Sequence, residues 1–115
     1  MPSKTFERLY VVGVPFPFTD KASSKRRPAV VLSGDASFNR ASKHAVLAIV
    51  TSATERAWPL DVQIADLGSA GLSVPCSVRF KLFTLDERLI VRKAGALAAK
   101  DRKAVTEATR SLFLA

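Results

Sequence analysis

The sequence predicts a mainly β fold that ends in one helix. Over the first three quarters of the 115 residues, short apolar runs rich in β-branched and aromatic residues are separated by turn-forming Pro, Gly, Ser, Asp and Asn. After Gly95, apolar residues recur at helical spacing instead. Five short strands make a small barrel or a curled sheet, and the length of the chain predicts a single domain over residues 1–115. Its hydrophobic fraction of 48% suffices for a core.

Five runs are expected to form strands. Ala29–Leu32 and Ala45–Val50 are apolar at consecutive positions, which is typical of strands covered on both faces, so we place them at the centre of the sheet. Leu60–Ile64 alternates apolar and polar residues, which indicates a strand with one face in water. The remaining two strands are Leu9–Val14 and Cys76–Phe83.

Local signals place the end of the first strand and two helices. Pro15 and Pro17 lack the N–H that a sheet ladder needs, so the first strand should end just before them in an irregular loop. Apolar residues recur at near-helical spacing over residues 98–113, with charged residues between them, which predicts an amphipathic helix packed on the sheet. A one-turn helix is also expected near Asp86–Leu89, with Thr84 as its N-cap.

The charge balance favours an anionic partner. The chain has 18 Lys and Arg against 10 Asp and Glu, which gives a net charge of +8, and its densest cation cluster is Lys25, Arg26 and Arg27. A field of this sign attracts polyanions such as nucleic acid or anionic lipid. The alternative is that the charge serves solubility alone.

Several classes of protein are disfavoured. No apolar run approaches the roughly 20 residues that a membrane-spanning helix needs, and the first eight residues lack the apolar core of a signal peptide, so we expect a cytoplasmic protein. Cys76 is the only cysteine and His44 the only histidine, which excludes an internal disulfide, a cysteine-rich metal site and a His–His metal motif. An intermolecular disulfide or a reactive thiol at Cys76 stays open.

The segment between the first two strands is the richest in candidate binding residues. In Phe16–Arg27, two phenylalanines and several hydroxyls precede three adjacent cations. Aromatic rings near cations stack bases and hold phosphates in proteins that bind single-stranded nucleic acid. The alternative is that Phe16 and Phe18 belong to the core and that the cations form a solvated turn.

Arg27 differs from the neighbouring cations because Pro28 follows it. Proline keeps the preceding residue out of the helical region, so Arg27 should lie at the mouth of a strand, where it either grips a phosphate or forms a structural ion pair. Thr51 and Ser52 leave the next buried strand, and their hydroxyls either point into the same mouth or cap the strand end. Gly68–Pro75 is either a substrate lid or rim, or a plain connection.

Five segments of the chain, taken in order, resemble the MazF/PemK family of type II toxins. They span nearly the whole sequence and are VPFPFTD (Val14–Asp20), SKRRPAVVLS (Ser24–Ser33), VLAIVTS (Val46–Ser52), KLFTLD (Lys81–Asp86) and RKAGAL (Arg92–Leu97). The resemblance implies an SH3-like small barrel of the MazF/PemK/CcdB type with a C-terminal helix, which forms a homodimer. It also implies a metal-independent, cofactor-free endoribonuclease that cleaves single-stranded RNA at selected sequences. A cognate antitoxin would inhibit it by laying a disordered acidic tail in the RNA groove.

The resemblance also assigns roles to individual residues. The family's functional arginine and threonine fall on Arg27 and Thr51, which would stabilise the phosphate while the 2′-OH of the RNA attacks it, leaving 2′,3′-cyclic phosphate and 5′-OH ends. Where the family usually has Gly and an acidic residue, this chain has Leu9 and Tyr10. RNA contacts are expected from residues around the catalytic pair, namely Phe16, Phe18, Ser24, Lys25, Arg26, Ser52 and Lys81.

The general base and two rival functions stay open. Arginine is essentially never deprotonated, His44 should lie at the opposite end of the third strand from Thr51, and water can accept the proton. One rival function is a gyrase-poisoning toxin of the same fold that acts through protein contact, and the other is an RNA-binding protein that does not cleave. Cleavage of a mixed RNA in EDTA separates these possibilities.

Overall fold

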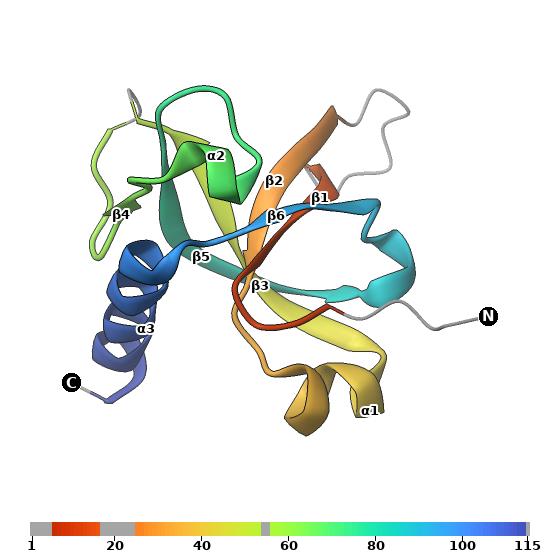
Figure 1. Ribbon diagram of the computed structural model, residues 1–115. Coiled ribbons are helices and arrows are strands. Elements are labelled where there is room, and N and C mark those ends of the chain that lie inside the picture. The colour runs from red at the N-terminus through yellow and green to blue at the C-terminus, as the bar shows by residue number, and fades with distance from the viewer. Residues whose placement is uncertain (1–5, 17–24, 54–55, 115) are drawn as a thin grey trace.

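The computed structural model describes residues 6–16, 25–53 and 56–114. Their main feature is a six-stranded antiparallel sheet that curls into a half-barrel (Figure 1). The order of the strands across the sheet is β4-β5-β3-β2-β1-β6. In chain order, the strands are β1 (Tyr10–Phe16), β2 (Lys25–Val31), β3 (His44–Ser52), β4 (Val62–Gln63), β5 (Cys76–Asp86) and β6 (Arg92–Ala96).

The two runs expected at the centre of the sheet form β2 and β3, which lie between β5 and β1. This prediction is confirmed. The run expected to have a wet face contributes the edge strand β4, which is shorter than Leu60–Ile64. Leu60 cannot begin the strand because it adopts a left-handed φ of 66° in the turn before it.

β1 extends past Pro15 to Phe16, beyond its expected end. Among the described residues, β6 pairs only with Tyr10–Gly13, whereas β2 pairs with β1 as far as Phe16. Pro15 therefore lies where β1 has a partner strand on one side, and the missing N–H is tolerated there. The longer β1 also carries β2 back to Lys25, ahead of its expected start at Ala29.

β6 is a strand that the sequence pattern does not indicate. It is held by pairing with β1 and by close packing of the short helix α2 (Leu67–Ala70). Two glycines permit this approach: a Cβ on Gly95 would lie 2.4 Å from the carbonyl oxygen of Ser69, and one on Gly71 would lie 2.1 Å from that of Ala94. The connection between α2 and β5 is thus fixed against the edge of the sheet.

The helix expected over residues 98–113 is α3 (Ala99–Leu114), and this prediction is confirmed. A 3-10 turn, Glu87–Leu89, follows β5 as expected, but Thr84 is not its N-cap because that residue lies within β5. The carboxylate of Asp86 provides the cap by accepting a hydrogen bond from a backbone N–H in the turn, at 2.9 Å.

A π-helical turn, Asp35–Asn39, and helix α1 (Arg40–Ser42) connect β2 to β3, and the sequence pattern does not indicate either. Asn39 is buried and holds this connection to the N-terminal segment, because its side-chain amide donates to the carbonyl oxygen of Phe6 at 2.7 Å. No helix within the described residues combines the length and the apolar character that a membrane crossing requires.

The sheet separates two apolar clusters, which define two faces. The helix face packs toward α3, and the far face is the opposite side of the sheet. Alternate residues of each strand point to alternate faces. The helix face includes Val11, Val30, Val78 and Val105, and the far face includes Val12, Val14, Ala29 and Leu47.

Two buried residues at the helix face show how closely its parts are joined. Asp101 of α3 is 2% exposed, and its carboxylate accepts hydrogen bonds from the backbone N–H groups of Ala65 and Asp66 at 2.9 and 3.0 Å. Leu9 is fully buried in a left-handed conformation, with φ of 71°, at the position where the MazF/PemK family usually has Gly. Leu9 therefore combines backbone strain with apolar burial.

Candidate functional site

Arg27 lies inside a strand and not at its mouth. β2 begins at Lys25, so Arg27 is its third residue and pairs with Val14 of β1. The prediction that Arg27 lies at the end of a strand is wrong. It assumed that the strand starts after Pro28, whereas Pro28 is itself paired within the sheet. Arg27 thus projects from a fixed strand position.

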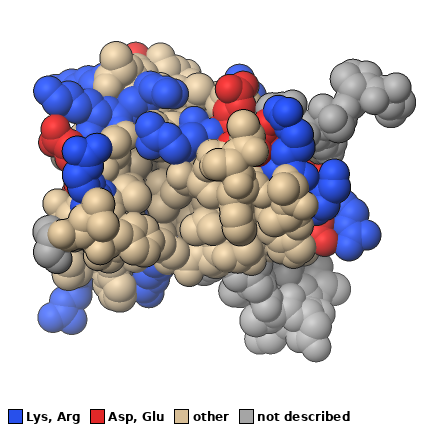
Figure 2. Space-filling model, turned by 90° about the horizontal axis from the view of Figure 1, so that it is seen from below, with Lys and Arg blue, Asp and Glu red and all other residues tan. Residues whose placement is uncertain are grey.

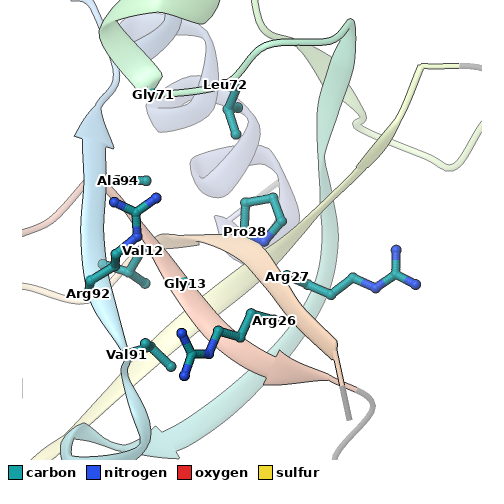
Figure 3. Close-up of a pocket in the computed structure, with 10 residues that line it drawn as sticks. All are labelled: Val12, Gly13, Arg26, Arg27, Pro28, Gly71, Leu72, Val91, Arg92 and Ala94. Atoms are coloured by element: carbon teal, nitrogen blue, oxygen red, sulfur yellow. The ribbon is translucent and has the colours of Figure 1, made fainter. Parts of the chain in front are cut away.

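The alternation of β2 separates Arg26 from Arg27. Arg26 lies on the helix face with Val30, and Arg27 lies on the far face with Ala29. Figure 3 shows the two side chains leaving the strand in opposite directions. The cation cluster in the sequence is therefore not a single patch in the structure.

On the far face, Arg27 and Thr51 line one pocket of about 70 Å³. Ala29 of β2 is opposite Ile49 of β3. Because the strands are antiparallel, Arg27, two residues before Ala29, and Thr51, two residues after Ile49, come to lie beside each other. Thr51 is half-buried, and Arg27 is exposed. The remaining walls of the pocket are Val14, Pro28, Ile49 and Val50.

The chemistry of this pocket suits an anion. Within the described ranges, the guanidinium of Arg27 makes no ion pair or hydrogen bond, so the reading of Arg27 as a structural ion pair finds no partner there. A guanidinium presents several N–H donors in a planar fork, and the hydroxyl of Thr51 adds another donor beside it. Together they can hold the oxygens of one phosphate.

A larger pocket of about 340 Å³ lies on the helix face, between β2, β6 and the segment after α2 (Figure 3). Arg26 and Arg92 face it, and neither forms an ion pair with any residue that the structure describes. Gly13 forms part of its floor, where a Cβ would meet no atom within 4 Å. The other lining residues are Val12, Arg27, Pro28, Gly71, Leu72, Val91 and Ala94.

A third group of candidate binding side chains lies on and beside β5. Lys81, an expected RNA contact, is exposed, and its Nζ lies 4.7 Å from the centre of the Trp58 ring. The guanidinium carbon of Arg79 lies 5.8 Å from the same ring. Sequence reasoning missed Trp58, Arg79 and also Arg92. Trp58 could have been singled out as the only tryptophan of the chain, but its contact with Arg79 depends on the fold.

The other expected RNA contacts are placed less fully. Phe18 and Ser24 lie outside the described residues. Phe16 and Lys25 pair with each other at the ends of β1 and β2, but their side chains are also outside that description. Ser52 is exposed and ends β3.

His44 and Cys76 lie apart from the Arg27–Thr51 pocket. His44 begins β3 at the end away from Thr51, as expected, and its Nδ1 lies 2.9 Å from the carbonyl oxygen of Ser42. Burial raises the pKa of the Cys76 thiol, which disfavours the reactive thiolate. Within the described part of the chain, no three His, Cys, Asp or Glu side chains gather into a group that could hold a metal ion.

The surface carries the excess of cations that the composition requires. In the view of Figure 2, Lys and Arg side chains outnumber Asp and Glu and gather along the rim, around a stretch of uncharged residues. A net charge of +8 favours the approach of polyanions over that of cations.

A protein-family model matches nearly the whole chain. The model is described as a PemK-like, MazF-like toxin of type II toxin-antitoxin systems, and it matches residues 7–113. No curated protein matches the chain.

Solved structures of similar fold include free and antitoxin-bound proteins. MazF from Deinococcus radiodurans is 23% identical, with a TM-score of 0.72 over 96% of this chain and 97% of that one. A MazE-MazF structure from the same organism is 25% identical, with a TM-score of 0.73 over 95% and 96%. An endoribonuclease in complex with its cognate antitoxin, from a mycobacterial species, is 14% identical, with a TM-score of 0.70 over 95% and 93%.

Proposed function

The chain belongs to the PemK-like, MazF-like family of toxins of type II toxin-antitoxin systems, and from this premise we propose that it is an endoribonuclease that cleaves single-stranded RNA at the Arg27–Thr51 pocket. The observation that carries the proposal is that Arg27 and Thr51, the positions of the family's functional residues, line one pocket on neighbouring strands. A related mycobacterial protein of the same fold is an endoribonuclease.

The reaction uses a nucleophile that the RNA supplies. The 2′-oxygen attacks the adjacent phosphorus, the bond to the 5′-oxygen of the next nucleotide breaks, and the products carry a 2′,3′-cyclic phosphate and a 5′-OH. The 2′-OH gives its proton to water, and the leaving oxygen takes one from water. The protein's part is to hold the phosphate in line and to stabilise the charge that develops on its oxygens.

Each residue of the pair has a defined task. Arg27 can donate two parallel hydrogen bonds to the non-bridging oxygens, and its charge stabilises the dianionic phosphorane most strongly in the transition state. Thr51 donates one further hydrogen bond and fixes the phosphate beside β3. Val14 and Ile49 form apolar walls beside the half-buried Thr51 and shield its hydroxyl from part of the water.

Two partners follow from the same proposal. We propose a homodimer, which is supported by the exposed apolar side chains of Leu112, Phe113 and Leu114 at the end of α3. We also propose an antitoxin whose acidic tail competes with RNA for the cationic surface. Support comes from the net charge of +8 and from the antitoxin complexes of similar fold.

The test is cleavage of a mixed-sequence RNA by purified protein in EDTA. We expect fragments whose 5′ ends are hydroxyls, and no cleavage at a site where a 2′-deoxy sugar precedes the scissile phosphate. Binding without cleavage would instead identify an RNA-binding protein, and neither binding nor cleavage would favour a toxin that acts on a protein. Products with a 5′-phosphate would contradict the mechanism while leaving the nuclease assignment intact.

A further inference from the structure

Trp58 lies on the same face of the sheet as the Arg27–Thr51 pocket. Along β5, Val78, Phe80 and Leu82 pack in the helix-face cluster, so Arg79 and Lys81, which alternate with them, point to the far face, although the register with β3 shifts at Phe80 and Lys81. Arg79 is opposite Ile49, which lines the Arg27–Thr51 pocket. The ring of Trp58 contacts both cations and therefore lies over the far face.

Hydrogen bonds hold the backbone of this tryptophan and the arginine that contacts its ring. Arg79 is only 9% exposed, and its guanidinium donates to both carboxylate oxygens of Asp61, at 3.3 and 3.1 Å, and to the carbonyl oxygen of Arg56. The same Asp61 carboxylate accepts a hydrogen bond from the backbone N–H of Trp58 at 3.0 Å. One acidic side chain thus fixes both the segment that carries Trp58 and the arginine beneath it.

Trp58 is partly exposed even though its backbone is hydrogen-bonded and its ring contacts two cations. The side chain is 40% exposed, although burying an aromatic ring of this size is strongly favourable. Lys81, also exposed, places a cation beside the ring. A partly exposed aromatic ring with an exposed cation next to it is the combination that binds bases and phosphates of single-stranded nucleic acids.

We propose that Trp58 is a stacking platform for a nucleobase of the RNA, with Lys81 contacting the phosphate of the same nucleotide. The inference rests on the proposed function, because it assigns the base a place near the scissile phosphate at Arg27 and Thr51. β5 and β2 are two strand spacings apart, about 10 Å, so one short RNA segment that crosses β3 reaches both groups.

Trp58 provides its own probe because it is the only tryptophan in the chain. The ligand is a mixed-sequence, fully 2′-O-methylated RNA with a fluorescent end label, which cannot be cleaved because no 2′-OH is free. Anisotropy of the label measures binding, and intrinsic emission of Trp58 measures stacking. We expect RNA to quench the tryptophan emission with the same dissociation constant that the anisotropy gives.

Substitutions separate stacking from a purely structural role. Trp58→Ala should weaken RNA binding about 5-fold to 100-fold, since stacking of a base on an aromatic ring has that value in other proteins, and Trp58→Phe should restore most of it. On unmodified RNA, Trp58→Ala should raise KM and change kcat little. The matched control is Phe38→Ala, because Phe38 is 39% exposed but lies in the π-helical turn between β2 and β3.

The outcomes distinguish failure of the stacking role of Trp58 from failure of the proposed endoribonuclease function. RNA binding without a change in tryptophan emission, or equal loss from the substitutions at Trp58 and Phe38, overturns the platform while cleavage keeps the proposed function. Absence of both binding and cleavage overturns both. If Trp58→Ala melts well below the wild-type protein, Trp58→Phe and the quenching of the wild-type protein still decide the question.

Discussion

The two faces of β2 carry arginines that are adjacent in sequence, Arg26 and Arg27, whose side chains have different surroundings. Arg27 faces a pocket of about 70 Å³ on the far face, beside the hydroxyl of Thr51. Arg26 faces a pocket of about 340 Å³ on the helix face, opposite another arginine, Arg92. The small pocket can fix one phosphate between two kinds of donor, whereas the large one gathers charge without a second hydrogen-bonding group of another kind. Strand alternation, and not cation density, thus decides which arginine can position a reacting group.

The largest expected effect concerns the far face. Arg27→Ala and Thr51→Val should each lower kcat for RNA cleavage about a hundredfold to a thousandfold, which is the usual cost of removing one donor to a developing charge. Arg27 is exposed and Val matches the shape of Thr, so the melting temperature should barely change. Single-turnover cleavage and thermal melting measure the two quantities. Wild-type activity in Arg27→Ala would reject the site.

The second prediction concerns α3, which packs against the helix face of the sheet. Asp101→Ala should lower the free energy of unfolding by about 2–4 kcal/mol, because it removes two hydrogen bonds from a buried carboxylate to the backbone N–H groups of Ala65 and Asp66. Urea denaturation measures this loss. Since the Arg27–Thr51 pocket is on the other face, kcat at a temperature where the variant is folded should stay near the wild-type value. A large loss of kcat in the folded variant would show that the two faces are coupled.

The third prediction compares the two arginine pockets directly. Arg92→Ala should change kcat less than tenfold, and Arg26→Ala should affect KM more than kcat, because both side chains lie on the helix face, away from Arg27. Loss of a cation should also reduce the salt dependence of RNA binding. Steady-state cleavage at two or more salt concentrations checks both statements. A hundredfold loss of kcat in Arg92→Ala would place catalysis in the larger pocket.

The sequence predicts those parts of the fold in which local pattern and tertiary position agree. Consecutive apolar residues indicate the central strands β2 and β3, and helical spacing indicates α3. β6 is different, because Arg92–Ala96 has little β-forming character of its own. Its strand conformation comes from pairing with β1 and from the contact of Gly95 with α2, which only the assembled fold provides.

The candidate site also has parts that the sequence predicts and parts that only the assembled fold provides. The Arg-Pro and Thr positions could be predicted because they lie in motifs that resemble a family, but the separation of Arg26 from Arg27 could not, since it depends on where β2 begins. The Trp58 contact was beyond sequence reasoning for a further reason. Arg79 and Asp61 are 18 residues apart. They meet because β4, which follows Asp61 directly, pairs with β5.

The smallest expected effect tests the floor of the larger pocket. Gly13 does not adopt the left-handed conformation, unlike Gly71, whose φ is 74°, and a Cβ on Gly13 would meet no atom within 4 Å. Gly13→Ala should therefore raise the free energy of unfolding by about 0.5–1 kcal/mol, because alanine loses less backbone freedom on folding. Gly95→Ala is the matched control and should be destabilising, since its Cβ would lie 2.4 Å from the carbonyl oxygen of Ser69. Urea denaturation of both variants makes the comparison. If Gly13→Ala were destabilising instead, the space beside Gly13, between Arg26 and Arg92, would be too small for a methyl group.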